Sequence, residues 1–409
     1  MRTSLPGAAV AAVADRLSGV DAARVARYPG DPGGRQPVHT CYVPADRVTG
    51  DVAETWGAAA LAALDEHAPD AAAFADLLDL PADLAESVHD KVIAKLRREP
   101  VEDLRIDFED GYGTRPDDEE DADAVRCAAL VPDLAPPWVG IRFTSFDTPA
   151  SFARGVRTLD LFVTELGRAP VLTFPKVTDV AQVSALVDLL GQLESHLGLT
   201  EGSLRFEIQI ETTQSIVDGE GRFAVPRFIA AGRGRVSGLH FGTYDYTAAC
   251  GLSAADQHLA HAACDFARHA MQVGAAGTGV RLSDGSTNVL PVGDAESVRA
   301  GWRTHHELVS RSLAHGFFQG WDLHPAQLVT RYAANFVHHL RNAPADADRL
   351  RAYVDGADAG VLDEPATAQA LAMSMRRAVD CGALSASDVT ELCGLSEVDL
   401  DALVRREPR

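Results

Sequence analysis

The sequence is short of basic residues and of long apolar runs, and each shortage excludes a class of protein. Lysine and arginine together number 37 against 59 aspartates and glutamates, so the formal charge is −22. Phosphate contacts need clustered basic side chains, and this balance therefore argues against a nucleic-acid binder or an anionic-membrane binder. No apolar run reaches the roughly 18 residues that a membrane-spanning helix needs, so no such helix is predicted.

Cysteine is also sparse. The six cysteines are scattered and include no C-x-x-C pair, which favours reduced thiols in a cytoplasmic protein over a disulfide framework or a zinc site. The Ala-rich start of the chain has only Arg2 before it and runs directly into Asp15 and Arg16. We interpret it as an amphipathic helix rather than as a signal peptide.

What the chain does have is length and a regular alternation of elements. Its 409 residues are 46% hydrophobic, enough for a large core and for a barrel of about 250 residues with additions. Short apolar runs separated by helical patterns occur at 38–45, 104–110, 138–145, 171–177, 204–213, 236–246, 278–284 and 317–325. Eight such runs predict an α/β fold of the (β/α)₈ TIM-barrel type, with an open doubly wound sheet as the alternative.

The predicted organisation has three parts. Residues 1–37 form an N-terminal helix and a Gly/Pro linker, and residues 38–330 form the barrel. The first connection of the barrel, at about 53–100, is long and is predicted to be a helical insertion. Residues 331–409 form a C-terminal helical region.

Charged residues share one face of a predicted strand at 104–110. Arg105, Asp107 and Glu109 alternate with Ile106 and Phe108, and alternate side chains of a strand point to opposite faces. The same phase recurs in three other runs, which carry Arg142, then Glu207, Gln209 and Glu211, then Asp322 and His324. We therefore expect these polar side chains to face the barrel lumen, with the last of each run at the carboxyl end, where barrel enzymes carry their chemistry.

Two of these acids are candidate metal ligands. Glu211 ends the fifth predicted strand and Asp245 follows the sixth. Carboxylate oxygens on neighbouring strand ends suit Mg²⁺ or Mn²⁺. The alternative, in which each acid pairs with a nearby arginine or lysine, is equally compatible with the spacing.

Several blocks together carry a family resemblance. CYVPA, DFEDG, IRF, FPKV, IQIETTQSI, LHFGTYDYT, GFFQGWDLHPAQ and GVLDEP occur in this order. The chain resembles the citrate lyase β-subunit, malyl-CoA lyase and HpcH/HpaI aldolase superfamily over about residues 38–380. The resemblance implies a Mg²⁺-dependent (β/α)₈ enzyme that makes or breaks a carbon–carbon bond beside a carbonyl, often on acyl-CoA substrates, and that forms trimers or hexamers.

The resemblance also assigns roles. Glu211 and Asp245 match the metal ligands, and Arg142 matches an arginine that contacts the substrate carbonyl or carboxylate. Glu109 matches an acid near the metal or its waters. Asp363 matches an aspartate that acts as acid or base from a neighbouring subunit.

Two further residues are candidate substrate contacts. Lys176 is interpreted as a structural or substrate-orienting ion pair, with Glu109 as a candidate partner, rather than as a Schiff-base lysine, which needs a depressed pKa. His324 at the end of the eighth run is either a substrate contact or a structural hydrogen bond. The chain departs from the CoA-using lyases because no lysine precedes the histidine in QGWDLHP, and Thr144 and Ser145 stand where an asparagine often follows Arg142.

The sequence therefore predicts a cytoplasmic, homo-oligomeric, Mg²⁺- or Mn²⁺-dependent carbon–carbon lyase or aldolase. Its expected substrate is a hydroxy-acyl-CoA or a hydroxylated 2-oxo acid, cleaved through an enolate that the metal and Arg142 stabilise. The alternatives are a malate synthase-like condensing enzyme, a phosphoenolpyruvate-using phosphotransferase and a non-catalytic barrel.

Overall fold

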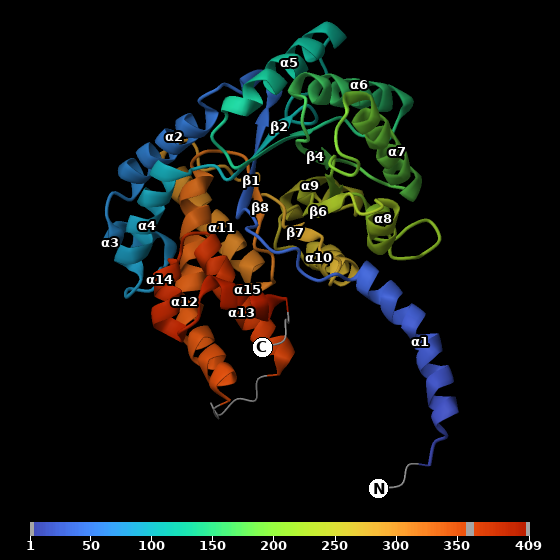
Figure 1. The fold of residues 1–409 in the computed structure, drawn as a ribbon. Coiled ribbons are helices and arrows are strands. Elements are labelled where there is room, and N and C mark those ends of the chain that lie inside the picture. The colour runs from blue at the N-terminus through green and yellow to red at the C-terminus, as the bar shows by residue number, and fades with distance from the viewer. Residues whose placement is uncertain (1–3, 357–363, 406–409) are drawn as a thin grey trace.

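The structure is a computed structural model that describes residues 4–356 and 364–405. Eight parallel strands form one sheet in the order β7-β6-β5-β4-β3-β2-β1-β8. The strands are β1 (His39–Pro44), β2 (Asp103–Asp107), β3 (Trp138–Arg142), β4 (Val171–Phe174), β5 (Phe206–Ile210), β6 (Val236–Phe241), β7 (Arg281–Ser283) and β8 (Gly320–Asp322). Each predicted strand is present, and the predicted (β/α)₈ barrel is confirmed (Figure 1).

The seam between β7 and β8 is where the sheet closes. No ladder pairs these two strands within the described residues, but two backbone hydrogen bonds cross from one to the other. Asp284 N–H donates to Gln319 O at 2.8 Å, and Trp321 N–H donates to Gly285 O at 3.4 Å. The barrel is therefore nearly closed, with a short and thinly bonded join.

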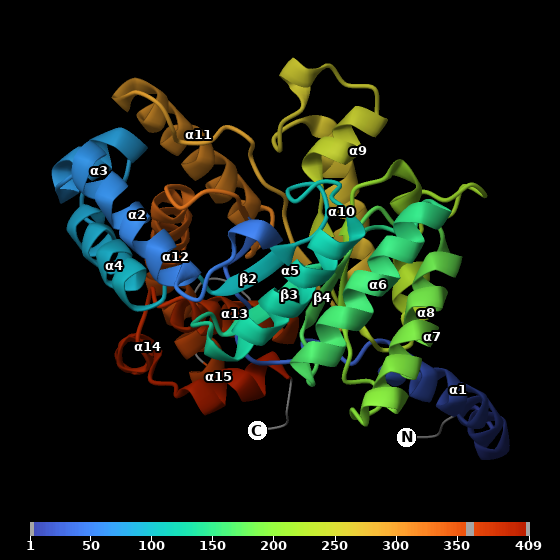
Figure 2. The ribbon, with the colours of Figure 1, turned by 90° about the horizontal axis from the view of Figure 1, so that it is seen from above.

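Helices surround the strands (Figures 1 and 2). The first connection holds α2 (Val52–His67), α3 (Ala71–Leu78) and α4 (Ala85–Arg98). The following connections hold α5 (Asp117–Leu130), α6 (Pro149–Leu166), α7 (Val180–Leu197), α8 (Val225–Ala231), α9 (Thr243–Ala249), α10 (Ala262–Ala275) and α11 (Ala295–Ala314). After β8 come α12 (Gln327–Asp355), α13 (Pro365–Asp380), α14 (Ala386–Cys393) and α15 (Glu397–Val404).

Local signals in the sequence set several helix ends. Thr148 and Ser151 form a capping box at the start of α6, where Pro149 takes the first helical position, and Asp179 with Gln182 forms another at the start of α7. Both helices end in a glycine with left-handed backbone, a conformation that glycine adopts without the steric cost of a Cβ atom. These signals thus define where α6 and α7 begin and end, so that each helix fits between two consecutive strands.

Helix α1 (Gly7–Arg27) stands apart from the barrel. Both ribbon views show it extending away from the body, and it has no buried residue (Figures 1 and 2). Among the described helices, none combines the length and apolarity that a membrane crossing requires.

The middle of the barrel lumen is filled by an ionic network. The guanidinium of Arg105 bonds Asp103 at 2.7 and 2.8 Å, and it bonds Glu207 Oε2 at 2.9 Å. Thr173 Oγ1 accepts a further hydrogen bond from Arg105 at 2.9 Å, and His240 approaches Glu207 at 3.3 Å. The inward charges predicted for β2 and β5 are therefore present, but this layer consists of mutually satisfied pairs and forms a floor beneath the strand ends.

The predicted phase of β8 was wrong. Trp321, not Asp322, faces the lumen, where its ring lies 4.7 Å from that of Tyr42 and 6.3 Å from that of His240. Asp322 instead faces the helices and bonds His305 of α11 at 3.1 Å and Arg331 of α12 at 2.9 Å. A buried carboxylate needs charged or hydrogen-bonding partners, and here the helix layer supplies them.

Candidate active site

The carboxyl ends of five strands bring seven charged side chains together. Asp107, Glu109 and Asp110 come from the end of β2 and its loop, Arg142 ends β3, Lys176 follows β4, Glu211 follows β5, and Asp245 lies in the first turn of α9 after β6. Because the strands are parallel, all these ends meet at one rim of the barrel. The rim is thus the place in the fold where acids from distant parts of the chain converge.

Arg142 is held rigidly by its neighbour on β2. Asp107 and Arg142 are register partners, and the Asp107 carboxylate accepts from Arg142 Nε and Nη2 at 2.7 Å each. The remaining nitrogen, Nη1, lies 3.3 Å from Glu109 Oε2, and the guanidinium stands 5.0 Å from the ring centre of Tyr42. Arg142 is therefore a preorganised cation with one nitrogen directed at the acidic group.

Lys176 lies at the centre of the acids. Its backbone has φ +52°, a left-handed conformation that is uncommon outside glycine. In this conformation its N–H donates to Glu211 Oε1 at 2.8 Å, while its ammonium lies 2.6 Å from Glu109 Oε1 and 3.6 Å from Asp245 Oδ2. It also bonds both carboxylate oxygens of Asp110, at 2.8 and 2.9 Å. Backbone strain of this kind is concentrated at functional sites.

The electrostatics of Lys176 argue against a role as a Schiff-base nucleophile. Burial acts to lower its pKa, but Glu109 and Asp110 outweigh that effect and hold the pKa above the ordinary lysine value. A Schiff-base lysine needs the opposite shift. The predicted ion pair with Glu109 is present at 2.6 Å.

Glu211 is the most perturbed acid of the group. Only 3% of its surface is exposed, and Gln209 Nε2 donates to its Oε2 at 3.0 Å. Burial raises the pKa of Glu211 to about 8, and the charges of Asp245 and Glu109 raise it in the same direction. Asp245, whose side chain is 45% exposed, opens the group to solvent.

Burial also raises the pKa of Glu109, with a further contribution from Asp110, against the opposing charges of Arg142 and Lys176. Asp110 behaves differently, because its hydrogen bonds to Lys176 outweigh burial and lower its pKa. Two acids in one loop are thus pushed in opposite directions. Such divergence is typical of acid–base sites.

The charge of the group is unbalanced. Five carboxyl groups surround two basic side chains, so three formal negative charges remain when all are ionised. Beside Glu211, the buried Oε1 of Gln209 has no hydrogen-bond partner within the described residues. Excess negative charge on hard oxygen donors fits a divalent cation such as Mg²⁺ or Mn²⁺.

A second group of side chains that could ligate a metal has a structural role instead. His39, Cys41 and Asp322 have donor atoms within 4.8 Å of one another. Asp322 is already neutralised by Arg331 at 2.9 Å, and burial raises the pKa of the Cys41 thiol, which keeps it protonated. This trio is therefore a structural network between the barrel and its helices.

The structure brings together five of the residues singled out in the sequence, which are Glu109, Arg142, Lys176, Glu211 and Asp245. His324 is not among them. It is half-buried, its Nδ1 accepts from Ala326 N–H at 3.2 Å, and no hydrogen bond or ion pair joins it to the five within residues 4–356 and 364–405. Asp363 lies outside the described residues.

Sequence reasoning missed the supporting residues. Asp107 was noted only for its face of the strand, whereas it fixes Arg142, and Asp110 had no role although it holds Lys176. Gly111 supports Asp107, because its N–H donates to Asp107 Oδ2 at 2.9 Å and a Cβ atom there would lie 2.5 Å from that oxygen. The signal was the compact D-x-E-D-G spacing of residues 107–111, in which Asp107 bonds Arg142 while Glu109 and Asp110 both bond Lys176.

Comparisons with known proteins bear on the fold. A family model described as "Domain of unknown function (DUF6986)" matches residues 17–407. No curated protein matches the chain. Among solved structures, the chain is similar to a citrate lyase from Burkholderia xenovorans LB400, with 17% identity and a TM-score of 0.58 over 89% of this chain and 98% of that one.

Two further solved structures are similar. Protein CitE from Mycobacterium tuberculosis, in complex with magnesium, acetoacetate and coenzyme A, has 18% identity and a TM-score of 0.50 over 85% of this chain and 98% of that one. Malate synthase from Haloferax volcanii has 15% identity and a TM-score of 0.49 over 91% and 99%. At these identities the first two likenesses show a shared fold, which is the barrel that the citrate lyase resemblance implied.

Proposed function

The chain belongs to the DUF6986 family, a domain family of unknown function, and we propose that it is a Mg²⁺- or Mn²⁺-dependent carbon–carbon lyase or aldolase. The observation that carries the proposal is the convergence of three acids on Lys176, whose ammonium lies 2.6 Å from Glu109 and 3.6 Å from Asp245 and whose backbone N–H donates to Glu211. Glu211 is buried, and its pKa is raised to about 8. Strongly perturbed carboxyls grouped at the carboxyl ends of barrel strands mark a functional site.

Glu211 and Asp245 are the residues that would hold the metal. Both offer oxygen donors, and the group carries more negative charge than Lys176 and Arg142 neutralise. When bound, a divalent cation supplies electrostatic stabilisation to a negatively charged substrate oxygen. Deprotonation of Glu211 is a condition of binding, because metal ligands must be in their basic form.

Arg142 is the proposed anchor for the substrate carboxylate or carbonyl. Asp107 fixes two of its nitrogens at 2.7 Å, so the guanidinium keeps one orientation and loses little entropy on binding. Its charge also favours an oxygen that becomes negative as the carbon–carbon bond breaks. Lys176 orients Glu109 and contributes a second positive charge at 2.6 Å.

The proposed reaction is a retro-aldol cleavage, in which no external oxidant or reductant takes part. A base takes the proton of the substrate hydroxyl, the carbon–carbon bond breaks, and its electrons pass to the neighbouring carbonyl as an enolate. The enolate carbon then takes a proton, which leaves an aldehyde or oxo acid and a second carbonyl compound. Glu109 is the described residue best suited to carry the proton, because it is buried and its pKa is raised. Asp363, in a neighbouring subunit, stays the proposed partner in this transfer.

The substrate class is either a hydroxylated 2-oxo acid or a hydroxy-acyl-CoA. The absence of a lysine before the histidine of QGWDLHP, together with the charge of −22, favours the free acid. The same site serves the condensing direction, since a catalyst accelerates both. A cytoplasmic homo-oligomer stays part of the proposal.

Mn²⁺ titration followed by electron paramagnetic resonance tests the metal site. We expect saturable binding to the wild-type protein and a loss of roughly tenfold or more in affinity for Glu211→Gln, because one charged ligand is removed. Glu165→Gln, at an exposed position on α6, is the matched control. Equal affinity in the wild type and in Glu211→Gln would refute the proposal.

A substrate screen tests the reaction. Hydroxylated 2-oxo acids and hydroxy-acyl-CoA thioesters are supplied with Mg²⁺, and release of glyoxylate, pyruvate or acetyl-CoA is read. Acetyl-CoA with glyoxylate covers the condensing direction. For the active substrate, Arg142→Met is expected to lower kcat/KM by about 10²-fold or more, because a fixed positive charge at the developing anion is lost. Full activity after removal of divalent metal by EDTA would contradict the mechanism.

A further inference from the structure

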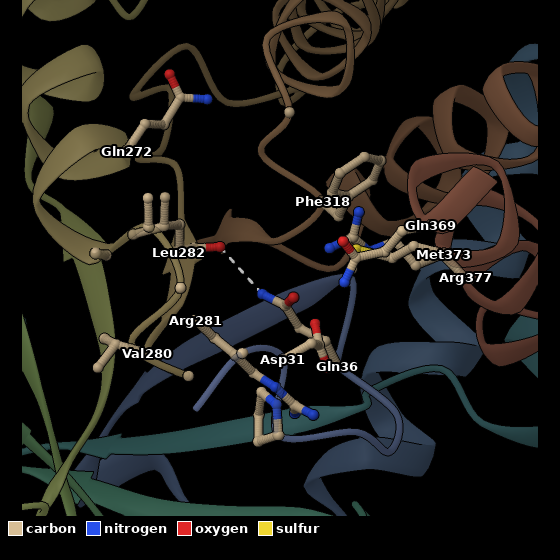
Figure 3. Close-up of a pocket in the computed structure, with 17 residues that line it drawn as sticks. Asp31, Gln36, Gln272, Val280, Arg281, Leu282, Phe318, Gln369, Met373 and Arg377 are labelled. Atoms are coloured by element: carbon tan, nitrogen blue, oxygen red, sulfur yellow. Dashed lines mark hydrogen bonds between the residues drawn. The ribbon is translucent and has the colours of Figure 1, made fainter. Parts of the chain in front are cut away.

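A cavity of about 370 Å³ lies at the amino ends of β7 and β8, at the opposite end of the barrel from the acids. Its walls come from the linker after α1, the end of α10, β7, the segment before β8 and α13 (Figure 3). The volume falls within the range of sites for small organic ligands. The proposed lyase reaction uses none of its residues.

Arg377 of α13 enters this cavity without an acid to neutralise it. Its guanidinium carbon lies 3.8 Å from the ring centre of Phe318, a cation–π contact. Within the described residues, its side-chain N–H groups have no hydrogen-bond partner, and no carboxylate lies within ion-pair distance. Burial lowers the pKa of Arg377 to about 10, with a smaller contribution in the same direction from the charge of Arg281, against the opposing charges of Asp31 and Asp380.

Arg281, at the start of β7, supplies a second positive charge. Its guanidinium donates to the backbone carbonyls of Gly33, Gly34 and Arg35 at 2.7 to 2.9 Å, which position it in the cavity wall. Carbonyl groups orient the guanidinium but do not neutralise it. Figure 3 shows Arg281 and Arg377 reaching the cavity from opposite walls, with Asp31 and Gln36 between them.

This arrangement is unusual for the chain. Other enclosed arginines each contact a carboxylate at 3.0 Å or less, and they include Arg35, Arg105, Arg142, Arg235, Arg268 and Arg331. In a protein of net charge −22, acids to pair with Arg281 and Arg377 are plentiful. Partly buried cations left without an acid carry a desolvation cost that a bound anion removes.

Asp31 limits the charge that the cavity accepts. Its carboxylate lines the cavity and takes a hydrogen bond from Gly33 N–H at 2.8 Å. Two guanidiniums and one carboxylate leave one net positive charge. Val280, Leu282 and Met373 add apolar surface around this charge.

We propose that this cavity is a binding site for a small organic anion, a carboxylate or a phosphate monoester, whose charged group bonds Arg377 and whose carbon skeleton lies against the apolar wall. Gln36 links the site to the barrel, because its amide N–H groups donate both to Leu282 O of β7 and to Gln319 Oε1 beside β8, at 3.0 Å each. The ligand thus contacts the residues that border the barrel seam.

Isothermal titration calorimetry on the full chain in EDTA tests the site. The probes are acetate, malate, inorganic phosphate and glycerol 3-phosphate, with glycerol as the uncharged comparison. We expect saturable binding of at least one anion and none of glycerol. Comparison of acetate and malate with inorganic phosphate and glycerol 3-phosphate shows whether the site binds a carboxylate or a phosphate group.

Matched variants locate the binding. Arg377→Met keeps the stem over Phe318 but removes the charge, and it is expected to weaken binding roughly tenfold or more, as the loss of a charged hydrogen bond does. Arg299→Met, at an exposed position of α11, makes the same chemical change elsewhere and is expected to have no effect. Arg142→Met separates this cavity from the acidic rim and is also expected to leave the affinity unchanged.

Asp31→Asn provides a test in the other direction. The substitution removes the opposing carboxylate and is expected to tighten anion binding. This variant therefore tests the site even if Arg377→Met folds poorly. The proposal is overturned if no anion binds, if binding survives unchanged in a folded Arg377→Met protein, or if it disappears in Arg142→Met.

Discussion

Gly242 and Glu211 lie so close that a methyl group on Gly242 would stand 2.3 Å from Glu211 Cβ and 2.5 Å from its Oε2. Only hydrogen fits between them, and the Gly242 N–H donates to Ile210 O at 3.0 Å, so the backbone cannot move away without breaking the link between β5 and β6. We expect Gly242→Ala to displace the Glu211 carboxylate and to weaken Mn²⁺ binding by roughly tenfold or more. Mn²⁺ titration measures this, with Gly219→Ala, which meets no atom within 4 Å, as the control. Wild-type affinity in Gly242→Ala would show that Glu211 does not hold the metal.

The raised pKa of Glu211 predicts a pH-dependent stability for the metal-free protein. In the folded state the pKa is about 8, against an ordinary value of 4.5, so the folded state holds a proton that the unfolded state releases across this window. The contribution is fully present below about pH 4.5, and it is lost as the pH rises through about 8. Urea unfolding in EDTA at pH 6 to 9 is expected to show decreasing stability, and Glu211→Gln to flatten that slope. A slope that is identical in Glu211→Gln would assign it to another group.

Lys176 is expected to act as an ammonium and not as a nucleophile. Its pKa is held above the ordinary value, so borohydride added with pyruvate should leave no reduced adduct on the residue, as peptide mass spectrometry will show. Lys176→Met removes the charge beside Glu109 and should lower kcat/KM by about tenfold or more. Lys91→Met on α4 is the comparison. A covalent adduct on Lys176 would replace the enolate mechanism by an imine mechanism.

The ionic floor of the lumen is expected to be essential for stability. Arg105→Met leaves Asp103 and Glu207 buried without their cation, which costs about 3–5 kcal/mol in the free energy of unfolding. Asp188→Asn removes the exposed pair with Arg233 and should cost less than about 1 kcal/mol. Chemical denaturation of both variants checks the contrast, and equal costs would contradict it.

We expect helix α1 to mediate the predicted self-association. Val10, Val13, Leu17 and Val20 are 44% to 61% exposed and follow the heptad spacing of a coiled-coil seam. An isolated helix of this length is marginal in water, and a second copy of α1 would cover the stripe. Leu17→Glu is expected to lower the mass measured by light scattering, whereas Ala11→Glu on the opposite face is not. An unchanged mass in Leu17→Glu would remove α1 from the assembly.

The fold was predictable because it depends on local patterns that repeat. Each apolar run became a strand, and the residues at the end of each run became the loops of the rim. The prediction for β8 failed because that strand has only three residues, and its two side chains, the amphipathic Trp321 and the charged Asp322, point to opposite faces. Alternation alone could not show that Asp322 would find His305 and Arg331 in the helix layer.

The site was predictable only in part. Spacing placed Glu211 and Asp245 on neighbouring strand ends, and the family resemblance added Arg142 and Glu109. The left-handed backbone of Lys176, which directs its amide to Glu211 and its ammonium to Glu109, depends on contacts between separate strands. The cavity that holds Arg281 and Arg377 joins β7 to a helix far along the chain, and no local pattern encodes that meeting.

The join between β7 and β8 has a consequence for motion in the barrel. Two backbone hydrogen bonds hold this join, whereas the central strands are linked by continuous ladders. Segments with few hydrogen bonds open at the lowest free-energy cost, so the amide protons of Asp284 and Trp321 should exchange with deuterated water before those of β3 and β4. We therefore expect the barrel to open first along this join, and an anion bound in the cavity beneath it to slow the exchange.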